Sequence, residues 1–471
     1  MATPGTPRVD RAGADDVLQL AVDRGGRVPM VIGALLVLDP RSRPAVDVVR
    51  SVVLRRVASV PRLGQRLVRT PPGAGRAVWL RVGADAVAAC VDSVVVEEGA
   101  GHSRDGSAAG PGGGGAPRAL LDALADLALT RLPGDRPLWR ARLLVAPDGG
   151  VSAIALVAHH VLADGMGGLA VLGALADPPG AASRRGDRPS ASGWAGPGSG
   201  PERLPTWGVL ARDAWAGRLR SLRRSGSSGR YLGGGMHELG LRRPHLADRC
   251  SLLGATGDRR RIEVATVDLE AVRTASRAAG ATVNDAVVTA VTGALVALLA
   301  RRGERVGELV VSVPVSRRRQ DDAAALGNET GVVPVRVPAL PDRGRRLAAL
   351  VDQQDRVRAP GRGGSAAVLT PAFRALAAVG AFQVFIDHQR LVHTFVTNVR
   401  GPAERLRVAG TEVTAVVPVA LNPGNVAVSF DVLSYAGTLG VSLVCDPGLL
   451  PESAWLAERI GAELEAFRPG G

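Results

Sequence analysis

The sequence VSAIALVAHHVLADG spans residues 151–165 and decides how the rest of the chain is interpreted. Its first eight residues are apolar except Ser152, and a run that is apolar on both faces predicts a central strand of a sheet. The strand ends on two adjacent histidines, His159 and His160. Because side chains alternate along a strand, the two imidazoles must point to opposite faces, so they cannot do the same job.

A histidine at a strand end suits acid-base chemistry, since imidazole titrates near neutral pH and can take a proton from a hydroxyl that attacks a carbonyl. Asp164 stands where the chain turns and can pair with an arginine or orient an imidazole, while Gly165 lets the backbone turn tightly. The alternative is two core histidines bonded to backbone groups, followed by an ordinary turn. The whole pattern favours one imidazole facing a substrate channel and the other packing behind it.

Apolar runs and helical periodicity around this segment predict a mixed α/β fold. The predicted strands lie at 28–38, 140–145, 151–160, 261–267, 309–315, 331–337, 391–398, 426–435 and 439–445, and the predicted helices at 48–57, 117–132, 207–222, 269–279 and from 284. A chain of 471 residues exceeds one ordinary hydrophobic core, and the composition from 177 to about 205 is typical of a linker. We therefore expect an N-terminal lobe at 1–180, a Gly/Pro/Arg-rich linker with an amphipathic helix at 181–250, and a C-terminal lobe at 251–471.

The large net charge says little about which partner the protein binds. The net charge is +14, but all 58 basic residues are arginine and Ala, Gly, Pro and Val are abundant, which is typical of a GC-rich genome such as those of actinobacteria. Aromatic residues make up only 3% of the chain, so stacking platforms for single-stranded nucleic acid are not expected. An ordinary solvated surface is favoured over a nucleic-acid partner, and the surplus charge also suits a phosphate-bearing ligand such as coenzyme A.

The residue types present exclude several classes of functional site and of targeting or membrane-spanning segment. The absence of lysine excludes a Walker A lysine and Schiff-base or pyridoxal phosphate chemistry. Three cysteines, distant in sequence, form neither a disulfide framework nor a Cys-x-x-Cys metal site, which fits a reducing cytoplasm. Residues 1–16 lack the apolar core of a signal peptide. The most apolar stretch, 281–300, contains Asn284 and Asp285 and is expected to be a buried helix rather than a membrane span.

The predicted helix at 207–222 is amphipathic. Trp207, Trp215 and Leu219 recur at helical spacing, with arginines mostly on the rest of the helix surface. Such a stripe either packs against the protein's own core or lies on a lipid surface, and the first reading is favoured. Peripheral attachment to the inner membrane or to lipid droplets is therefore a hypothesis beside the expected cytoplasmic location.

Taken together, the motifs resemble those of the bacterial wax ester synthase/diacylglycerol acyltransferase family, within the larger group of histidine-dependent acyltransferases that includes chloramphenicol acetyltransferase and condensation domains. The string from His159 to Gly165 has the His-His-x-x-x-Asp-Gly signature of that whole group. Further matches, in the family's order, are Val28-Pro29-Met30, Arg136-Pro137-Leu138-Trp139, Thr282 to Val288, Pro314 to Arg317, Gly327-Asn328 and Thr397 to Pro402.

The resemblance implies two chloramphenicol acetyltransferase-like lobes that meet along a channel. It implies transfer of an acyl group from acyl-CoA to a long-chain alcohol or diacylglycerol, which gives wax ester or triacylglycerol. His160 is then the general base, His159 a supporting residue and Asp164 a structural partner. Acyl-CoA is a co-substrate, and no resident cofactor, metal or covalent acyl-enzyme is expected. Two positions depart from the family pattern: Val31, where members carry His, and Ala436, where they carry Asp.

Other candidate site residues can be substrate-binding or structural, and both readings stay open. These residues are Gly165, Pro137, Leu138, Trp139, Asn284, Asp285 and Asn398. Asn284-Asp285 also fits a helix N-cap followed by a first-turn acid, and Asn398 can hydrogen-bond across the channel or stabilise a turn. Two rival functions remain at this stage: a condensation-type acyltransferase with a carrier-protein-bound donor, and a catalytically weak relative that binds lipid.

Overall fold

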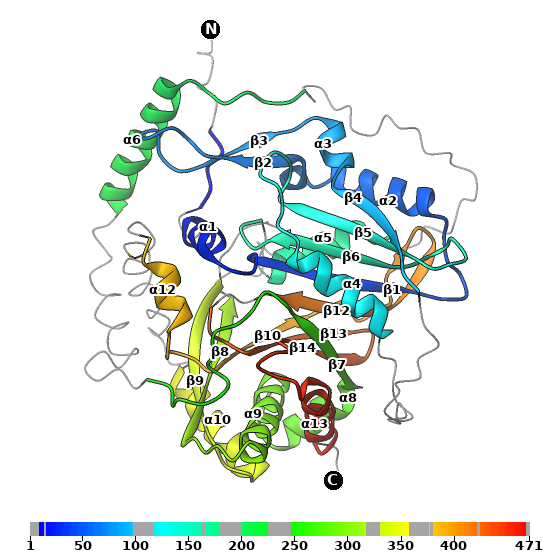
Figure 1. The fold of residues 1–471 in the computed structure, drawn as a ribbon, viewed down its shortest axis with the longest axis vertical. Helices are drawn as coiled ribbons and strands as arrows, with labels where there is room; N and C mark the ends of the chain where they lie inside the picture. The colour runs from blue at the N-terminus through cyan, green and yellow to red at the C-terminus, as the bar shows by residue number, and fades with distance from the viewer. Residues whose placement is uncertain are drawn as a thin grey trace.

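The computed structural model describes residues 9–13, 16–97, 116–162, 165–178, 200–224, 246–316, 330–357, 376, 380–421 and 424–467. They form two six-stranded sheets with helices packed against them, and a separate two-stranded ribbon (Figure 1). The predicted mixed α/β fold is confirmed.

The first sheet has the order β11-β12-β1-β6-β5-β4. Its strands are β1 (Val31–Leu38), β4 (Val91–Val95), β5 (Trp139–Val145), β6 (Val151–His159), β11 (Arg407–Val408) and β12 (Thr411–Ala420). Helix α4 (Arg118–Leu129) packs on one face, whereas α2 (Val46–Ala58) and α5 (Gly165–Leu175) pack on the other. Strand β6 is central and apolar on both faces because helices cover both sides, as its sequence predicts.

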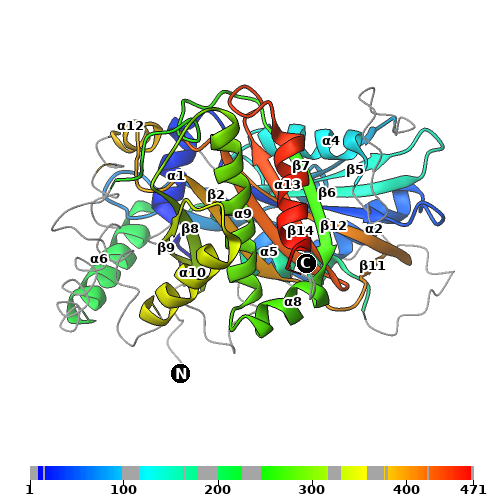
Figure 2. The same cartoon turned by 90° about the horizontal axis from the view of Figure 1, so that it is seen from below.

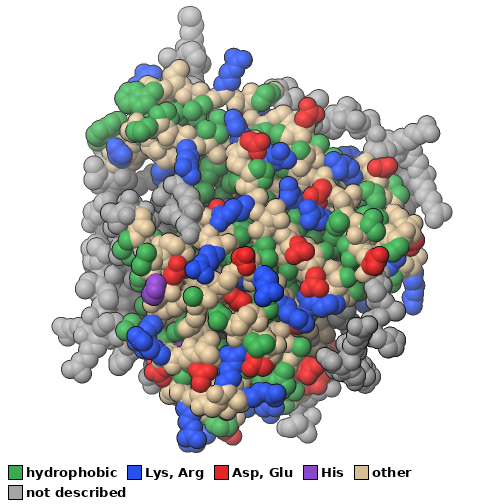
Figure 3. All heavy atoms as spheres, in the orientation of Figure 1, with side chains coloured by type: hydrophobic (Ala, Val, Ile, Leu, Met, Phe, Trp, Pro, Cys, Tyr) green, Lys and Arg blue, Asp and Glu red, His purple; other side chains and the backbone are tan. Residues whose placement is uncertain are grey.

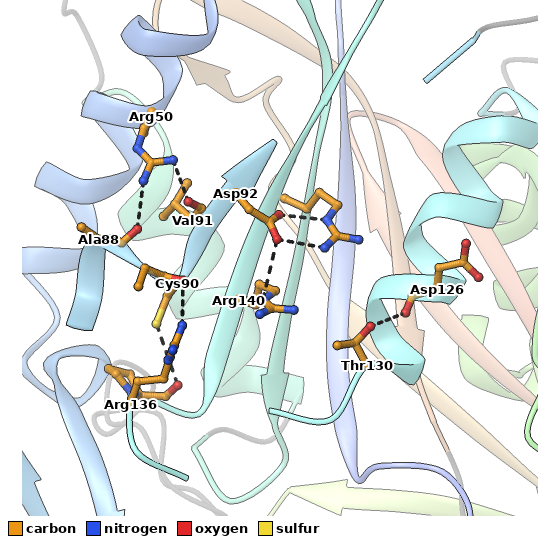
Figure 4. Close-up of polar contacts among 12 residues, drawn as sticks. Arg50, Ala88, Cys90, Val91, Asp92, Asp126, Thr130, Arg136 and Arg140 are labelled. Carbon is orange, nitrogen blue, oxygen red and sulfur yellow. Dashed lines mark hydrogen bonds and ion pairs between the residues drawn. The ribbon is translucent and has the colours of Figure 1, made fainter. Parts of the chain in front are cut away.

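Charged groups hold the edge strand β4 in place (Figure 4). Arg50 of α2 donates hydrogen bonds to the carbonyls of Val91, at 2.7 Å, and Ala88, at 3.1 Å. Asp92 of β4 pairs with Arg142 of β5 at 2.8 Å and lies 3.9 Å from Arg140. The pairing raises the pKa of Arg142, mainly through the hydrogen bond to Asp92. This end of the first sheet is therefore fixed by ion pairs as well as by its ladder.

The second sheet has the order β7-β14-β13-β10-β8-β9. Its strands are β7 (Arg261–Asp268), β8 (Glu308–Ser316), β9 (Thr330–Pro338), β10 (Thr394–Arg400), β13 (Val428–Tyr435) and β14 (Thr438–Cys445). Helices α8 (Leu269–Ala278), α9 (Val283–Arg301), α10 (Arg343–Val357) and α13 (Ser453–Glu465) lie on one side of it, as Figure 2 shows. Among the described residues, α9 alone is long and apolar enough to cross a membrane, but most of it is buried in this core.

The remaining elements lie around the first sheet and at the side of the molecule. They are α1 (Asp16–Gly25), the 3-10 turn η1 (Pro61–Gly64), β2 (Gln65–Val68), β3 (Val78–Arg81), α3 (Ala84–Ala88), α6 (Trp207–Arg224) and α12 (Phe382–Asp387). Helix α6 docks through the fully buried Leu210 against the β2–β3 ribbon. The predicted stripe of Trp207, Trp215 and Leu219 is instead exposed, which corrects the expectation that it packs on the core.

A strand from the C-terminal part of the chain completes the N-terminal sheet. Strand β12 pairs antiparallel with β1 from Ile32, opposite Ala420, to Leu38, opposite Val413. This strand is not among the predicted ones, and the three-part division at 180 and 250 does not anticipate that a C-terminal segment joins the N-terminal sheet. The two lobes are therefore joined by a continuous ladder as well as by side-chain packing.

Two tight turns in the C-terminal half contain alanine in a left-handed conformation. Ala436 has φ 47° and precedes Gly437 in the two-residue loop between β13 and β14. Ala409 has φ 54° and precedes Gly410 between β11 and β12. Such loops favour Asn-Gly or Asp-Gly, because both residues need positive φ. The departure from the family pattern at Ala436 therefore falls at a strained turn position.

We expect Ala436→Asn to raise the free energy of unfolding by about 0.5–1 kcal/mol, because asparagine tolerates left-handed backbone better than alanine. Ala436→Val should lower it by about 1 kcal/mol, because a β-branched side chain is strained at positive φ. Urea denaturation followed by circular dichroism measures both effects. Equal midpoints for the two variants would contradict this account of the turn.

Candidate functional site

The two histidines stand at the end of β6, held by backbone bonds to its neighbours. The His159 N–H donates to the Leu138 carbonyl at 2.8 Å, and the His160 N–H donates to the Met30 carbonyl at 2.9 Å. The imidazoles lie on opposite sides, as alternation along a strand predicts, and each contributes to the wall of a different cavity. One ring can therefore meet a substrate on one side while the other ring anchors the strand end.

Helix α1 contacts both imidazoles. Gln19 and Asp23 are four residues apart on it and so share one face. The Gln19 side-chain nitrogen lies 3.2 Å from Nδ1 of His160, and Asp23 Oδ2 lies 3.8 Å from Nε2 of His159. This helix is not among the predicted ones, although the spacing of Gln19 and Asp23 before the opening strand is the signal that could have found it.

His159 is buried and anchored by its surroundings. Its Nδ1 accepts a hydrogen bond from the Val161 N–H at 3.0 Å, so the ring proton belongs on Nε2, which faces Asp23. Asp23 also accepts from the Met30 N–H at 3.0 Å. Burial raises the pKa of the Asp23 carboxyl, but the neighbouring His159 side chain and the Met30 N–H outweigh burial and hold that pKa below its usual value. Asp23 is therefore an anion that orients His159.

His160 faces an apolar cavity between the two sheets. The cavity is about 960 Å³ including the part open to solvent, and β1, β6, β12, α5, β10 and β13 supply its walls. Among the described residues that line it, only His160, Thr397 and Asp431 have polar side chains. Gly33 on the wall allows close strand packing, since a Cβ there would lie 2.2 Å from the Leu156 carbonyl oxygen. The arrangement presents an imidazole to a hydrocarbon-lined space that both lobes enclose.

Asp431 is the second ionisable group on this wall, and the sequence analysis did not select it. It lies on β13 and is 4% exposed, with Oδ2 accepting a hydrogen bond from the Ala420 N–H of β12 at 2.7 Å. Burial raises the pKa of its carboxyl to about 7, although the bond from Ala420 opposes the change. A single charged residue inside a predicted strand that is otherwise uncharged was the signal that could have identified it.

The Pro-Leu-Trp residues lie beside the histidines as packing. Pro137 and Leu138 are buried, and Leu138 contributes to the cavity beside His159. The Trp139 ring is fully buried, and its Nε1 donates to the Leu63 carbonyl at 2.8 Å. These residues support the strand end where His159 and His160 stand.

Three of the predicted site residues lie near one another: Asn284, Asp285 and Asn398. None of them is among the described residues that line the His160 cavity. Asn398 Nδ2 is 3.4 Å from Asn284 Oδ1. The N-cap of α9 is Thr282 rather than Asn284, and Asp285 closes a capping box by accepting from the Thr282 N–H at 2.8 Å. Asp164, Arg317 and Asn328 fall outside the described residues, and Gly165 is the first residue of α5.

The described residues also bear on metal and thiol chemistry. Across the described ranges, no three His, Cys, Asp or Glu side chains meet in a group that could hold a metal ion. Cys90 and Cys445 are buried, and burial raises the pKa of each thiol to about 12. Neither thiol is therefore suited to act as a nucleophile at neutral pH.

Comparisons with known sequences indicate one family. The family model for the wax ester synthase/diacylglycerol acyltransferase catalytic domain matches residues 101–287, and that for the WS/DGAT C-terminal domain matches residues 326–468. A Mycobacterium tuberculosis protein named as a diacylglycerol O-acyltransferase, tgs1, is 28% identical over 93% of this chain and 91% of its own length. Another diacylglycerol O-acyltransferase by name, from the same species, is 25% identical over 96% of this chain and 88% of its own length.

Solved structures agree on the fold. The wax ester synthase/diacylglycerol acyltransferase of Marinobacter aquaeolei VT8 is 20% identical, with a TM-score of 0.62 over 97% of this chain and 99% of that one. The first condensation domain of the calcium-dependent antibiotic synthetase is 19% identical, with a TM-score of 0.59 over 98% and 96% of the two chains. With the family models spanning more than two thirds of its length, the chain belongs to the wax ester synthase/diacylglycerol acyltransferase family of acyl-CoA-dependent acyltransferases.

Proposed function

We propose that the protein esterifies a long-chain alcohol or diacylglycerol with the acyl group of acyl-CoA, and that His160 is the general base. The observation that carries the proposal is the position of His160, which stands at a strand end on the wall of an apolar cavity between the lobes. A long acyl chain needs such a hydrocarbon lining, and the reacting hydroxyl needs a base beside it.

The proposed reaction is a direct transfer. His160 takes the proton of the acceptor hydroxyl as its oxygen attacks the thioester carbonyl. The tetrahedral intermediate then collapses, the carbon–sulfur bond breaks, and the imidazolium returns its proton to the departing coenzyme A thiolate. The products are an ester and free coenzyme A, and His160 ends neutral. The buried, protonated Cys90 and Cys445 do not favour a covalent route.

Gln19 supports the tautomer that this role requires. A base that uses Nε2 must carry its own proton on Nδ1, and the Gln19 amide lies 3.2 Å from Nδ1. Either end of an amide fits such a contact, because its nitrogen and oxygen have nearly the same shape. Gln19 Oε1 is buried without a partner when the nitrogen faces His160. Turning the amide lets Oε1 accept from Nδ1–H, which satisfies the buried oxygen and fixes His160 as a base.

Replacing His160 tests the proposal. We expect His160→Ala to lower ester formation by about a hundredfold to ten-thousandfold, the usual contribution of a general base. Radiolabelled palmitoyl-CoA is supplied with hexadecanol or diolein, and the esters are separated by thin-layer chromatography. His388→Ala is the matched control, because His388 is an exposed histidine at the end of α12.

The same assay separates the rival functions. Product from a carrier-protein-bound acyl donor, with none from palmitoyl-CoA, would replace the proposal with a condensation-type reaction. Binding of the lipids with no turnover of either donor would indicate a lipid-binding relative. Full activity of His160→Ala would refute the assignment of the base.

Gln19 variants test the positioning of the base. Gln19→Leu should lower kcat about tenfold with little change in KM, since it removes one orienting hydrogen bond. Gln19→Glu should move the acidic limb of the pH–rate profile to higher pH, because a carboxylate beside the ring stabilises the imidazolium. Initial rates from about pH 5 to about pH 9 measure both effects. A purely structural role for Gln19 would leave the shape of the profile unchanged.

We also propose that α6 attaches the cytoplasmic protein peripherally to a membrane or lipid droplet. Trp207, Trp215 and Leu219 are 58%, 60% and 54% exposed, and they share one face of α6. Figure 3 shows hydrophobic side chains gathered over this helix at the upper left of the molecule. Arg218 lies beside this face, with its guanidinium 5.3 Å from the Trp215 ring. Exposed tryptophans beside arginines are typical of helices that lie at an anionic lipid surface.

Flotation with vesicles of anionic phospholipid tests this attachment. Trp207→Ala/Trp215→Ala should lower the vesicle affinity about tenfold or more, because each indole contributes a large buried apolar area. Val48→Ala/Val95→Ala is the control, since these valines are exposed on α2 and β4. No difference between the tryptophan variant and the wild type would remove the membrane role of α6.

A further inference from the structure

Asp431 places a carboxyl group on the wall of an apolar cavity, and this position needs an explanation. Transfer of an ionised carboxylate from water to an apolar environment costs several kcal/mol unless a cation or several donors compensate it. Asp431 receives one backbone hydrogen bond, from Ala420, and no arginine lies on the cavity wall among the described residues. A cavity that only held hydrocarbon would be more stable with leucine at this position.

We propose that Asp431 is a specificity-determining residue whose carboxyl hydrogen-bonds an oxygen that the acceptor carries a few bonds from its reacting hydroxyl. The site then favours an ester-bearing acceptor over a plain long-chain alcohol. This inference rests on the proposed esterification at His160, and it adds a residue that distinguishes the two acceptor classes.

The register of the strands gives the separation between Asp431 and His160. Ala158, Ile32 and Ala420 lie in one row across β6, β1 and β12, and Asp431 bonds to the last of them. Two strand spacings and two residues of rise separate the Ala420 and His160 backbones by roughly 12 Å. Both side chains line the same cavity. A separation of this order suits an acceptor of glycerol-ester size that is hydrogen-bonded at both ends, with its hydroxyl at His160 and its ester at Asp431.

The free oxygen of Asp431 is available for such a contact. Oδ2 is occupied by the Ala420 N–H, and no described residue bonds Oδ1. Neighbours in register are uncharged: Thr397 on β10 and Ser442 on β14. Among the described residues on the cavity wall, the other titratable group is His160. With burial raising its pKa to about 7, the Asp431 carboxyl is largely protonated below neutral pH and can donate to an ester carbonyl.

The test compares two single-chain acceptors, ethylene glycol monopalmitate and hexadecanol, with palmitoyl-CoA as donor. The wild type at about pH 6 should prefer the ester-bearing acceptor about threefold to tenfold in kcat/KM, the contribution of one hydrogen bond. Asp431→Leu should lose that preference while still esterifying hexadecanol. Asp268→Asn, a surface carboxylate at the N-cap of α8, is the control and should keep it.

A second variant keeps the inference testable if Asp431→Leu does not fold. The wild-type preference should decline from about pH 6 to about pH 8.5, because the carboxylate cannot donate. Asp431→Asn keeps a donor and an acceptor at every pH, so its preference should persist at the higher pH. A preference equal in all variants, or independent of pH in the wild type, would overturn the role of Asp431.

Two further outcomes are separable. A wild type that esterifies neither acceptor contradicts the proposed function itself, whereas activity with an unchanged preference in Asp431→Leu contradicts only this inference. A wild-type preference for an amino alcohol such as sphingosine, lost in Asp431→Leu, would overturn this inference. It would show that Asp431 acts as an ionised carboxylate that binds an ammonium group.

Discussion

The pairing of β1 with β12 is the constraint on which the site depends. It joins residues almost four hundred positions apart, from Ile32 with Ala420 to Leu38 with Val413, and makes a segment of the C-terminal half part of the N-terminal sheet. Because β1 also pairs with β6, the ladder fixes the end of β12 relative to His160. Asp431 then bonds to Ala420 and ties the second sheet to the same row. The cavity wall is thus a consequence of backbone hydrogen bonds more than of side-chain packing.

The two histidines show how one strand end serves two purposes. Strand alternation separates the rings, and α1 contacts each of them through Gln19 or Asp23. His159 has its proton placed by the Val161 N–H and faces a carboxylate, so its ring orientation is determined. His160 faces the cavity, and its Nδ1 lies beside the Gln19 amide. The amide orients the ring.

Local patterns predicted most of the fold, and long-range contacts could not be predicted. The apolar run before His159 specified β6, and periodicity located most of the strands and helices of both lobes. Strand β12 alternates only partly and pairs with β1, which lies hundreds of residues away, so no local signal assigns it to this sheet. The contacts of Gln19 with His160 and of Asp431 with Ala420 could not be predicted either, because no local pattern signals which residues meet in three dimensions. Motif recognition placed His160, but only three-dimensional neighbours identify the groups that orient it.

The contrast between Asp431 and Asp23 separates a structural carboxylate from a functional candidate. Asp23 meets a histidine and a backbone N–H, its pKa falls, and its ionised form is satisfied by the fold. Asp431 has one donor, its pKa rises, and the residue lines the cavity where a substrate would lie. A fold that needs only the Ala420 contact could make it with a smaller, uncharged hydroxyl side chain. Retaining a carboxyl there costs stability as the pH rises from about 4 to about 7, because over that range the folded state still binds a proton that the unfolded state has released. Residues that lower stability in this way concentrate at functional sites, so the cavity of His160 is the place where such a cost has a function.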